Sequence, residues 1–173
     1  RASATQRAGR AGRLEPGTCY RLWSQAQHQQ LAAYATAEIL QADLAGLALQ
    51  LARWGVVPGE LSWLDQPPPA AFAQARDLLV RLGALDAHGA LTNHGQAMAE
   101  LPAHPRIAHL LLRGQALGLA DLACDLAALL GERDILKGAG ADLHSRMALL
   151  AGEQRASRNA QGGVQRARQL ARQ

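Results

Sequence analysis

The sequence predicts a mainly α-helical protein, and three observations support that prediction. Apolar residues make up 49% of the 173 residues and aromatic residues only 3%. Most of the apolar residues are Ala and Leu, which have the highest helix propensities. Apolar side chains also recur at helical spacing in several windows, whereas the apolar runs typical of strands are short. A chain of this length accommodates one or two small domains.

The N-terminal third is expected to begin with short elements. Glu15-Pro16-Gly17 is typical of a turn, because proline presets φ and glycine accepts positive φ. Residues 18–23 then predict a short strand. Ser24 is a suitable N-cap for a short polar helix that ends at Gln30.

The next stretch predicts a helix, a short strand, a second helix and a hairpin. The first helix carries an apolar stripe, and Gly55 follows it as the expected C-terminal cap residue. Residues 61–64 are compatible with a strand, and the second helix starts at Pro69 and ends at Gly83. Two short apolar runs at 84–85 and 90–91 flank an Asp/Gly turn, as in a β-hairpin. This order of elements is typical of a winged-helix domain. The apolar stripe of the first helix consists of Leu44, Leu47, Ala48, Leu51 and Trp54.

Helices are expected through the remainder of the apolar sequence. Thr92 should cap a helix that ends before Pro102, and Pro105 should open the next. A partner helix follows over 119–130, and Gly114 within the apolar stripe predicts a close approach between helices. Asp142 should cap a further helix. Beyond Gly152 the apolar signal falls away, so a helix is allowed from Val164 onward but is expected to bury little.

Charge is distributed unevenly along the chain. Residues 1–23 hold five Arg and one acid, residues 24–136 hold six Arg and eleven acids, and residues 137–173 hold Lys137 and six Arg against two acids. Basic ends around an acidic middle indicate an anion site at one end and a polyanion contact at the other. The high Arg content is equally explained by a GC-rich genome.

Membrane and disulfide frameworks are not expected. No run of eighteen or more apolar residues occurs, so no membrane-spanning helix and no membrane partner are predicted. Cys19 and Cys124 lie far apart and give no disulfide framework, which favours a reducing, cytoplasmic location. The six histidines show no metal-ligand spacing with one another or with a cysteine, so no metal site is predicted.

The first residues contain the most informative motif, Gln6-Arg7-Ala8-Gly9-Arg10-Ala11-Gly12-Arg13. Arginine forks match phosphate oxygens bidentately, and glycines allow a backbone to turn sharply and lie close to a ligand. Such an array suits the charge that develops on a transferring phosphoryl group. A solvated basic segment is the alternative interpretation.

QRAGRAGR resembles motif VI of superfamily 2 helicases, in the form found in the DEAH/RHA group. In that family the motif closes the ATP site from the second RecA-like domain. The resemblance implies that Gln6 helps to position the nucleophilic water or the γ-phosphate, and that Arg10 and Arg13 are arginine fingers. Gly9 would belong to the same ATP-binding set, with Arg7 supporting the motif.

A second resemblance begins at Leu82-Gly83-Ala84-Leu85. It continues through Gly89-x-Leu91-Thr92-x-x-Gly95-x-x-Met98-Ala99-x-Leu101-Pro102 and Pro105-Arg106, which resemble the winged helix and helicase-associated (ratchet) domain of the same group. Residues 121–134 resemble its bacterial HrpB-type branch. The resemblance implies four parts: the C-terminal end of the second RecA-like domain with motif VI (1–30), a winged helix (31–92), a helical ratchet domain (93–152) and a partly helical basic tail (153–173).

The resemblance implies a C-terminal portion of an ATP-dependent RNA or DNA helicase. ATP with Mg²⁺ would be used by the full-length protein and none bound by this fragment alone, because a GxxxxGK[ST] loop and a DEAH box are absent from the sequence. Expected partners are a single-stranded RNA or DNA and the upstream RecA-like domains. A non-enzymatic winged-helix module that binds nucleic acid or protein is the alternative. The expected nucleic-acid contacts are Arg106, Arg113, Arg146, Arg155, Arg158 and Arg166.

Overall fold

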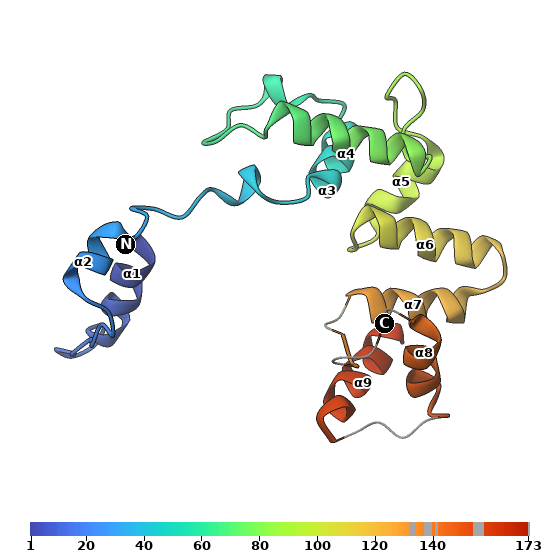
Figure 1. Ribbon diagram of the computed structural model, residues 1–173. Coiled ribbons are helices and arrows are strands. Elements are labelled where there is room, and N and C mark those ends of the chain that lie inside the picture. The colour runs from blue at the N-terminus through green and yellow to red at the C-terminus, as the bar shows by residue number, and fades with distance from the viewer. Residues whose placement is uncertain (132–133, 137–139, 141, 154–157, 173) are drawn as a thin grey trace. The chain divides into compact units, whose positions relative to one another are not determined.

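The computed structural model describes all residues except 132–133, 137–139, 141, 154–157 and 173, and it omits the side chains of 158–160. The helical elements are α1 (Ala2–Ala11), α2 (Gln25–Gln30), η1 (Glu38–Leu40), α3 (Ala45–Trp54), η2 (Pro58–Glu60), α4 (Pro69–Arg81), α5 (Asn93–Glu100), α6 (Pro105–Ala116), α7 (Ala120–Gly131), α8 (Leu143–Ala151) and α9 (Arg158–Ala171) (Figure 1). The prediction of a mainly α-helical chain is therefore confirmed. No helix among the described residues has the length and apolar character needed to cross a membrane.

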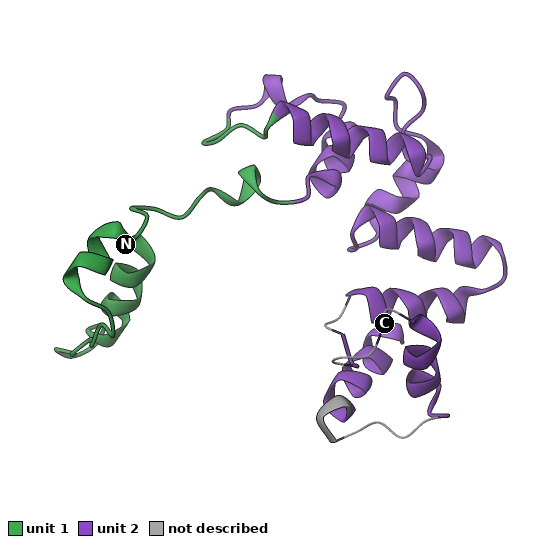
Figure 2. Cartoon of the chain, in the orientation of Figure 1, with its two compact units in different colours: residues 1–42, 63–68 green, residues 43–62, 69–173 purple. Residues whose placement is uncertain are grey.

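The chain forms two compact units, coloured separately in Figure 2. The first comprises residues 1–42 and 63–68, and the second comprises residues 43–62 and 69–173. In the first unit, Ser24 caps α2 through a reciprocal capping box with Gln27, as the sequence predicted. The backbone amide of Ala2 donates to the carbonyl of Ala33 at 3.0 Å, which ties the start of α1 to the segment that follows α2.

In the second unit, α3 packs against both α4 and α5. Gly55 ends α3 in the left-handed conformation with φ of 72°, which confirms its role as a cap residue. Thr92 caps α5 by accepting a hydrogen bond from the amide of Gly95 at 2.9 Å. Gly95 itself allows a close approach, because a Cβ there would lie 2.1 Å from the carbonyl oxygen of Ala84.

The predicted strands are largely wrong. Residues 18–23 and 61–64 form no strand, and the predicted hairpin is reduced to one antiparallel bridge between Leu85 and Leu91. Asp86 closes the turn between them by accepting hydrogen bonds from the amides of His88 and Ala90, each at 2.9 Å. Short apolar runs do not make a strand unless a neighbouring chain offers a ladder of backbone hydrogen bonds.

Helices α6 and α7 form an antiparallel hairpin that is visible side by side in Figure 1. Gly114 lies at their closest approach: a Cβ there would lie 2.3 Å from the Cβ of Ala123. The prediction of a close helix approach at Gly114 is confirmed. The turn between the helices uses Gly118 at φ of 72°.

The C-terminal segment buries more than the sequence suggested. Helix α9 begins at Arg158, and its Val164 and Ala167 are 5% and 0% exposed. They belong to one apolar cluster with residues of α7 and α8, so the expectation of a tail that buries little is wrong. Small residues allow α9 to approach closely despite its low apolar content, since a Cβ at Gly163 would lie 3.0 Å from a side-chain carbon of Ile135.

Candidate functional site

The QRAGRAGR motif forms most of helix α1 and the turn after it. Gln6 and Arg10 are four residues apart, so they share one face of the helix, and both are exposed. Arg13 is also exposed but lies beyond the helix end at Ala11. Gly9 lies inside the helix and not at a sharp turn, so that part of the expectation is wrong. The helix therefore presents Gln6 and Arg10 together to solvent, with Arg13 on the following turn.

The first unit also contains an open hollow of about 980 Å³. Its lining includes Arg7, Tyr20, Trp23 and Tyr34, but none of Gln6, Arg10 and Arg13. The hollow is therefore not the predicted ATP-facing surface, because the three residues to which the motif assigns chemistry lie outside it.

Sequence reasoning did not identify a polar cluster on the rim of this hollow. The Nε1 of Trp23 donates to Nδ1 of His28 at 3.3 Å, and Nη1 of Arg21 lies 3.5 Å from Nε2 of the same ring. A neutral imidazole has one acceptor nitrogen, so only one of these two contacts is a hydrogen bond at a time. Partial desolvation, followed by the charge of Arg21, lowers the pKa of His28 and favours this neutral ring.

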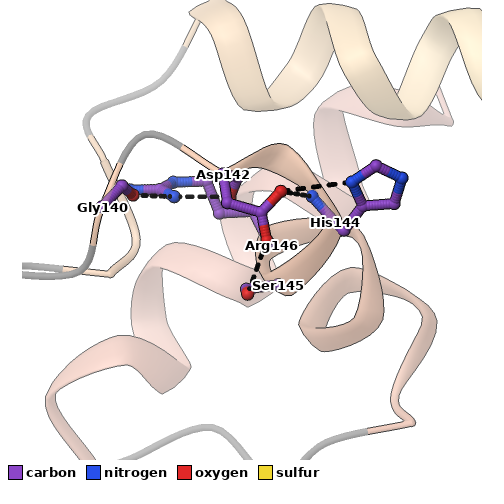
Figure 3. Close-up of polar contacts among 5 residues, drawn as sticks. All are labelled: Gly140, Asp142, His144, Ser145 and Arg146. Carbon is purple, nitrogen blue, oxygen red and sulfur yellow. Dashed lines mark hydrogen bonds and ion pairs between the residues drawn. The ribbon is translucent and has the colours of Figure 1, made fainter.

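Arg146, one of the expected nucleic-acid contacts, is a buried structural residue in α8. Its side chain is only 8% exposed, and it lies beside Gly140 and Asp142, which precede the helix (Figure 3). Nε and Nη2 donate to the two carboxylate oxygens of Asp134 at 2.8 and 2.6 Å, and Nη1 donates to the carbonyls of Gly140 and Asp142 at 2.8 and 2.7 Å. The hydrogen bonds from Arg146 hold the pKa of Asp134 at about 2. The guanidinium of Arg146 therefore stabilises the fold, and this corrects the expectation that it contacts nucleic-acid phosphates.

The start of α8 is stabilised by the N-cap that the sequence predicted. Asp142 accepts hydrogen bonds from the amide of His144 at 3.0 Å and from the hydroxyl of Ser145 at 3.1 Å (Figure 3). The pKa of Asp142 is lowered, chiefly by the hydrogen bond from the His144 amide. At the other end of the same helix, Arg168 of α9 donates to the carbonyls of Leu149 and Leu150.

The remaining expected nucleic-acid contacts differ in what the structure says of them. Arg106 and Arg113 are exposed and seven residues apart in α6, so they share one helix face. Arg166 is exposed in α9. Arg158 is the first residue of α9, but its side chain is not described, and Arg155 lies outside the described residues. The structure therefore places Arg106 and Arg113 on one helix face.

Among the described residues, no three His, Cys, Asp or Glu side chains gather as a metal site would require. Two histidines that the sequence separates by fifteen positions do meet: Nε2 of His94 and Nδ1 of His109 lie 2.9 Å apart. A sequence search for ligands three or four residues apart could not detect this pair, because its members lie on different helices.

Comparison with known proteins supports one family. Residues 75–103 match the family described as "Helicase associated domain (HA2), winged-helix". The chain is 46% identical over 132 residues to the ATP-dependent RNA helicase HrpB of Escherichia coli K12, which covers 76% of this chain and 16% of that protein. It is 33% identical over 138 residues to the probable ATP-dependent RNA helicase DHR2 of Saccharomyces cerevisiae, covering 78% of this chain and 18% of that protein.

Solved structures give the same result. A crystal structure of the Escherichia coli DEAH/RHA helicase HrpB matches with a TM-score of 0.72 and 38% identity, covering 99% of this chain and 21% of that one. The chain thus spans only about a fifth of the relatives that it resembles. Sequence and fold agree over nearly all of its length, so the chain is similar to part of the DEAH/RHA helicases.

Proposed function

We propose that this chain is part of an ATP-dependent RNA helicase that couples ATP hydrolysis to translocation along a single strand and to unwinding. The observation that carries the proposal is the 46% identity over 132 residues with HrpB, whose name describes an ATP-dependent RNA helicase. The QRAGRAGR motif adds a chemical reason, since exposed arginines on a short helix suit phosphate recognition.

In this proposal, Gln6, Gly9, Arg10 and Arg13 contribute to an ATP site that is completed by another RecA-like domain. Amide and guanidinium groups fit phosphate oxygens, whereas Mg²⁺ prefers carboxylate and other oxygen ligands. The GxxxxGK[ST] loop and the DEAH box are absent from this sequence, so in this proposal the residues that hold Mg²⁺ would be supplied by the upstream RecA-like domain. Arg10 and Arg13 would stabilise the charge on the transferring phosphoryl group, and Gln6 would orient the attacking water.

The nucleic-acid contacts in this proposal are phosphate contacts from exposed arginines. Arg106 and Arg113 on α6 provide one basic face, and Arg166 with Arg155 and Arg158 provides a second group near α9. The first pair is supported by a shared helix face and by exposure of both residues. RNA is the proposed substrate, and the same contacts would hold a DNA strand, so the two are compared directly in binding assays.

The proposed domain organisation follows the same family. Residues 1–30 would complete the second RecA-like domain, 31–92 would form the winged helix, and 93–152 would form the ratchet domain beside the nucleic-acid channel. Residues 153–173 would be a basic segment, most of which is folded as α9. The protein would act in the cytoplasm, without a membrane partner.

The test requires a polypeptide that contains this chain together with the phosphate-binding loop and the DEAH box. Arg10→Ala and Arg13→Ala should each lower kcat for ATP by a factor of ~10³ to 10⁵, with little change in RNA affinity. Arg81→Ala is a matched control, because Arg81 is exposed in α4 of the other unit. Normal hydrolysis by both finger variants would refute the proposed roles, whereas a loss of RNA binding alone would place these arginines at the nucleic acid.

A further inference from the structure

A pair of histidines joins helices α5 and α6. Nε2 of His94 and Nδ1 of His109 lie 2.9 Å apart, which is hydrogen-bonding distance. The rings meet edge to face, with centroids 5.0 Å apart and an interplanar angle of 85°. Both residues are half-buried. The contact is therefore a specific side-chain hydrogen bond between two helices that are adjacent in sequence.

The chemistry of imidazole limits the protonation states in which this bond exists. One ring must donate an N–H, and the other must offer a nitrogen lone pair, so at least one ring must be neutral. A single added proton is compatible with the bond, because an imidazolium can still donate. A second proton removes the acceptor and places two positive rings in contact. We propose that His94 and His109 form a proton-sensitive latch, which holds α5 against α6 and opens when both rings are protonated.

The charges around the pair oppose the second proton. Helix α5 packs against α3 and α6, and α6 also packs against α7. Among the described residues, no acidic side chain forms an ion pair with either ring. The charged residues on these four helices are Arg53, Glu100, Arg106, Arg113, Asp121 and Asp125.

The direction of the pKa shift agrees with this arrangement. Burial lowers the pKa of His94, and the positive charges of His109 and Arg113 lower it further. A group whose pKa is lower in the folded state than in the unfolded chain stabilises the fold at high pH, and this contribution is lost as pH falls. The latch should therefore be closed above the ordinary pKa of His, near 6.5, and should weaken as the solution becomes more acidic.

The latch lies at the junction between α5 and α6. Met98 of α5 and Ala108 of α6 are both fully buried. The C-terminal end of α5 is also held by α3, because Gln50 and Arg53 each donate to the carbonyl of Ala99 at 3.3 Å. The hydrogen bond of the latch is instead made to α6, so its loss should loosen α5 from α6 and leave α5 anchored to α3.

Nuclear magnetic resonance of the whole chain tests the coupling between the two rings. The imidazole signals are followed from about pH 8 to about pH 5, a range that brackets the ordinary pKa of His. His94 should titrate below about 6.5, and His109→Gln should raise its midpoint, because a neutral amide replaces a ring that becomes charged. His88→Gln is the control, since His88 is exposed in the turn at 86–90, and it should change nothing. Independent titration of both rings near the ordinary value would overturn the proposal.

Amide hydrogen exchange tests whether the junction responds. In the unaltered chain, protection of amides in α5 and α6 should fall relative to those in α8 once both rings are protonated. The double variant His94→Gln, His109→Gln should show no such fall, because neither glutamine ionises. An equal fall in both proteins, or constant protection in the unaltered chain, would show that the pair does not act as a latch. If the double variant fails to fold, the unaltered chain and the single variants still decide the outcome.

Discussion

The close contact between α6 and α7 at Gly114 provides a quantitative test of the fold. We expect Gly114→Ala to destabilise the protein, because the new Cβ would lie 2.3 Å from the Cβ of Ala123 and 3.3 Å from the carbonyl oxygen of Leu119. Ordinary van der Waals contacts of a Cβ fall between 3.4 and 4 Å, so α6 and α7 would have to separate or slide. The Cβ of Ala123 and the carbonyl oxygen of Leu119 are both fixed to the backbone, so neither can move away by a change of side-chain rotamer.

The expected size follows from two opposing effects. Overpacking a core usually costs ~1–3 kcal/mol. Replacing a glycine by alanine within a helix returns ~0.5–1 kcal/mol, because the unfolded chain loses conformational freedom. The net loss should be about 1 kcal/mol from the midpoints of these ranges and at most about 2.5 kcal/mol, and each kcal/mol lowers Tm by about 2–4 °C for a chain of this size. Thermal unfolding followed by circular dichroism measures it.

Two further variants separate a clash from other causes. Gly46→Ala is the matched control, because Gly46 is also helical and a Cβ there meets no atom within 4 Å, so Tm should rise slightly. Ala123→Gly should cost less when Gly114 has been replaced than when it has not, since it removes the clashing atom. If Gly114→Ala raises Tm as much as Gly46→Ala does, the close approach of α6 and α7 is refuted.

Three other predictions follow from the structure. Arg146→Met should make the free energy of unfolding less dependent on pH in acid. The lowered pKa of Asp134 stabilises the fold above pH 3.8, and that contribution is lost as the pH falls through about 2. Urea unfolding across this pH range measures the effect, and an unchanged pH dependence would contradict the ion pair. The chain alone should not hydrolyse ATP in a phosphate-release assay with RNA present, and turnover above background would refute the division of the ATP site between domains. Arg172 is exposed just after α9, near the end of the same basic segment as Arg166. Replacing both arginines by Gln should reduce the slope of log K against log salt for single-stranded RNA by about 1.4 if both contact phosphates, since each contact contributes about 0.7.

The sequence alone was sufficient to predict a helix end where the cap is formed by residues next to that end. Thr92 and Asp142 cap α5 and α8 as predicted, because a side-chain oxygen reaches an amide only two or three residues away. Gly55 and Gly83 adopt positive φ where the sequence placed helix ends. The family resemblance was also recognisable from the sequence, since it depends on the identity and order of residues such as those in QRAGRAGR.

Strands and the C-terminal segment were predicted poorly, because both depend on distant partners. The apolar runs at 18–23 and 61–64 form no strand in the structure, which local propensity could not reveal. Helix α9 has few apolar side chains, but α7 and α8 offer a surface that accepts Val164 and Ala167. Whether so small a pair of side chains forms part of a core is decided by the shape of the surrounding helices.

For the charged residues too, the sequence predicted some features and only the tertiary structure showed others. The sequence by itself determined that arginines are concentrated at the two ends of the chain and that one motif has the composition of a phosphate site. Only the tertiary structure showed that Arg146 is buried against Asp134 whereas Arg106 and Arg113 remain exposed on one helix face. It also brought His94 and His109 together across fifteen positions. A guanidinium or an imidazole has the same chemistry in either setting, and what it binds is decided by the groups that folding places within hydrogen-bonding distance.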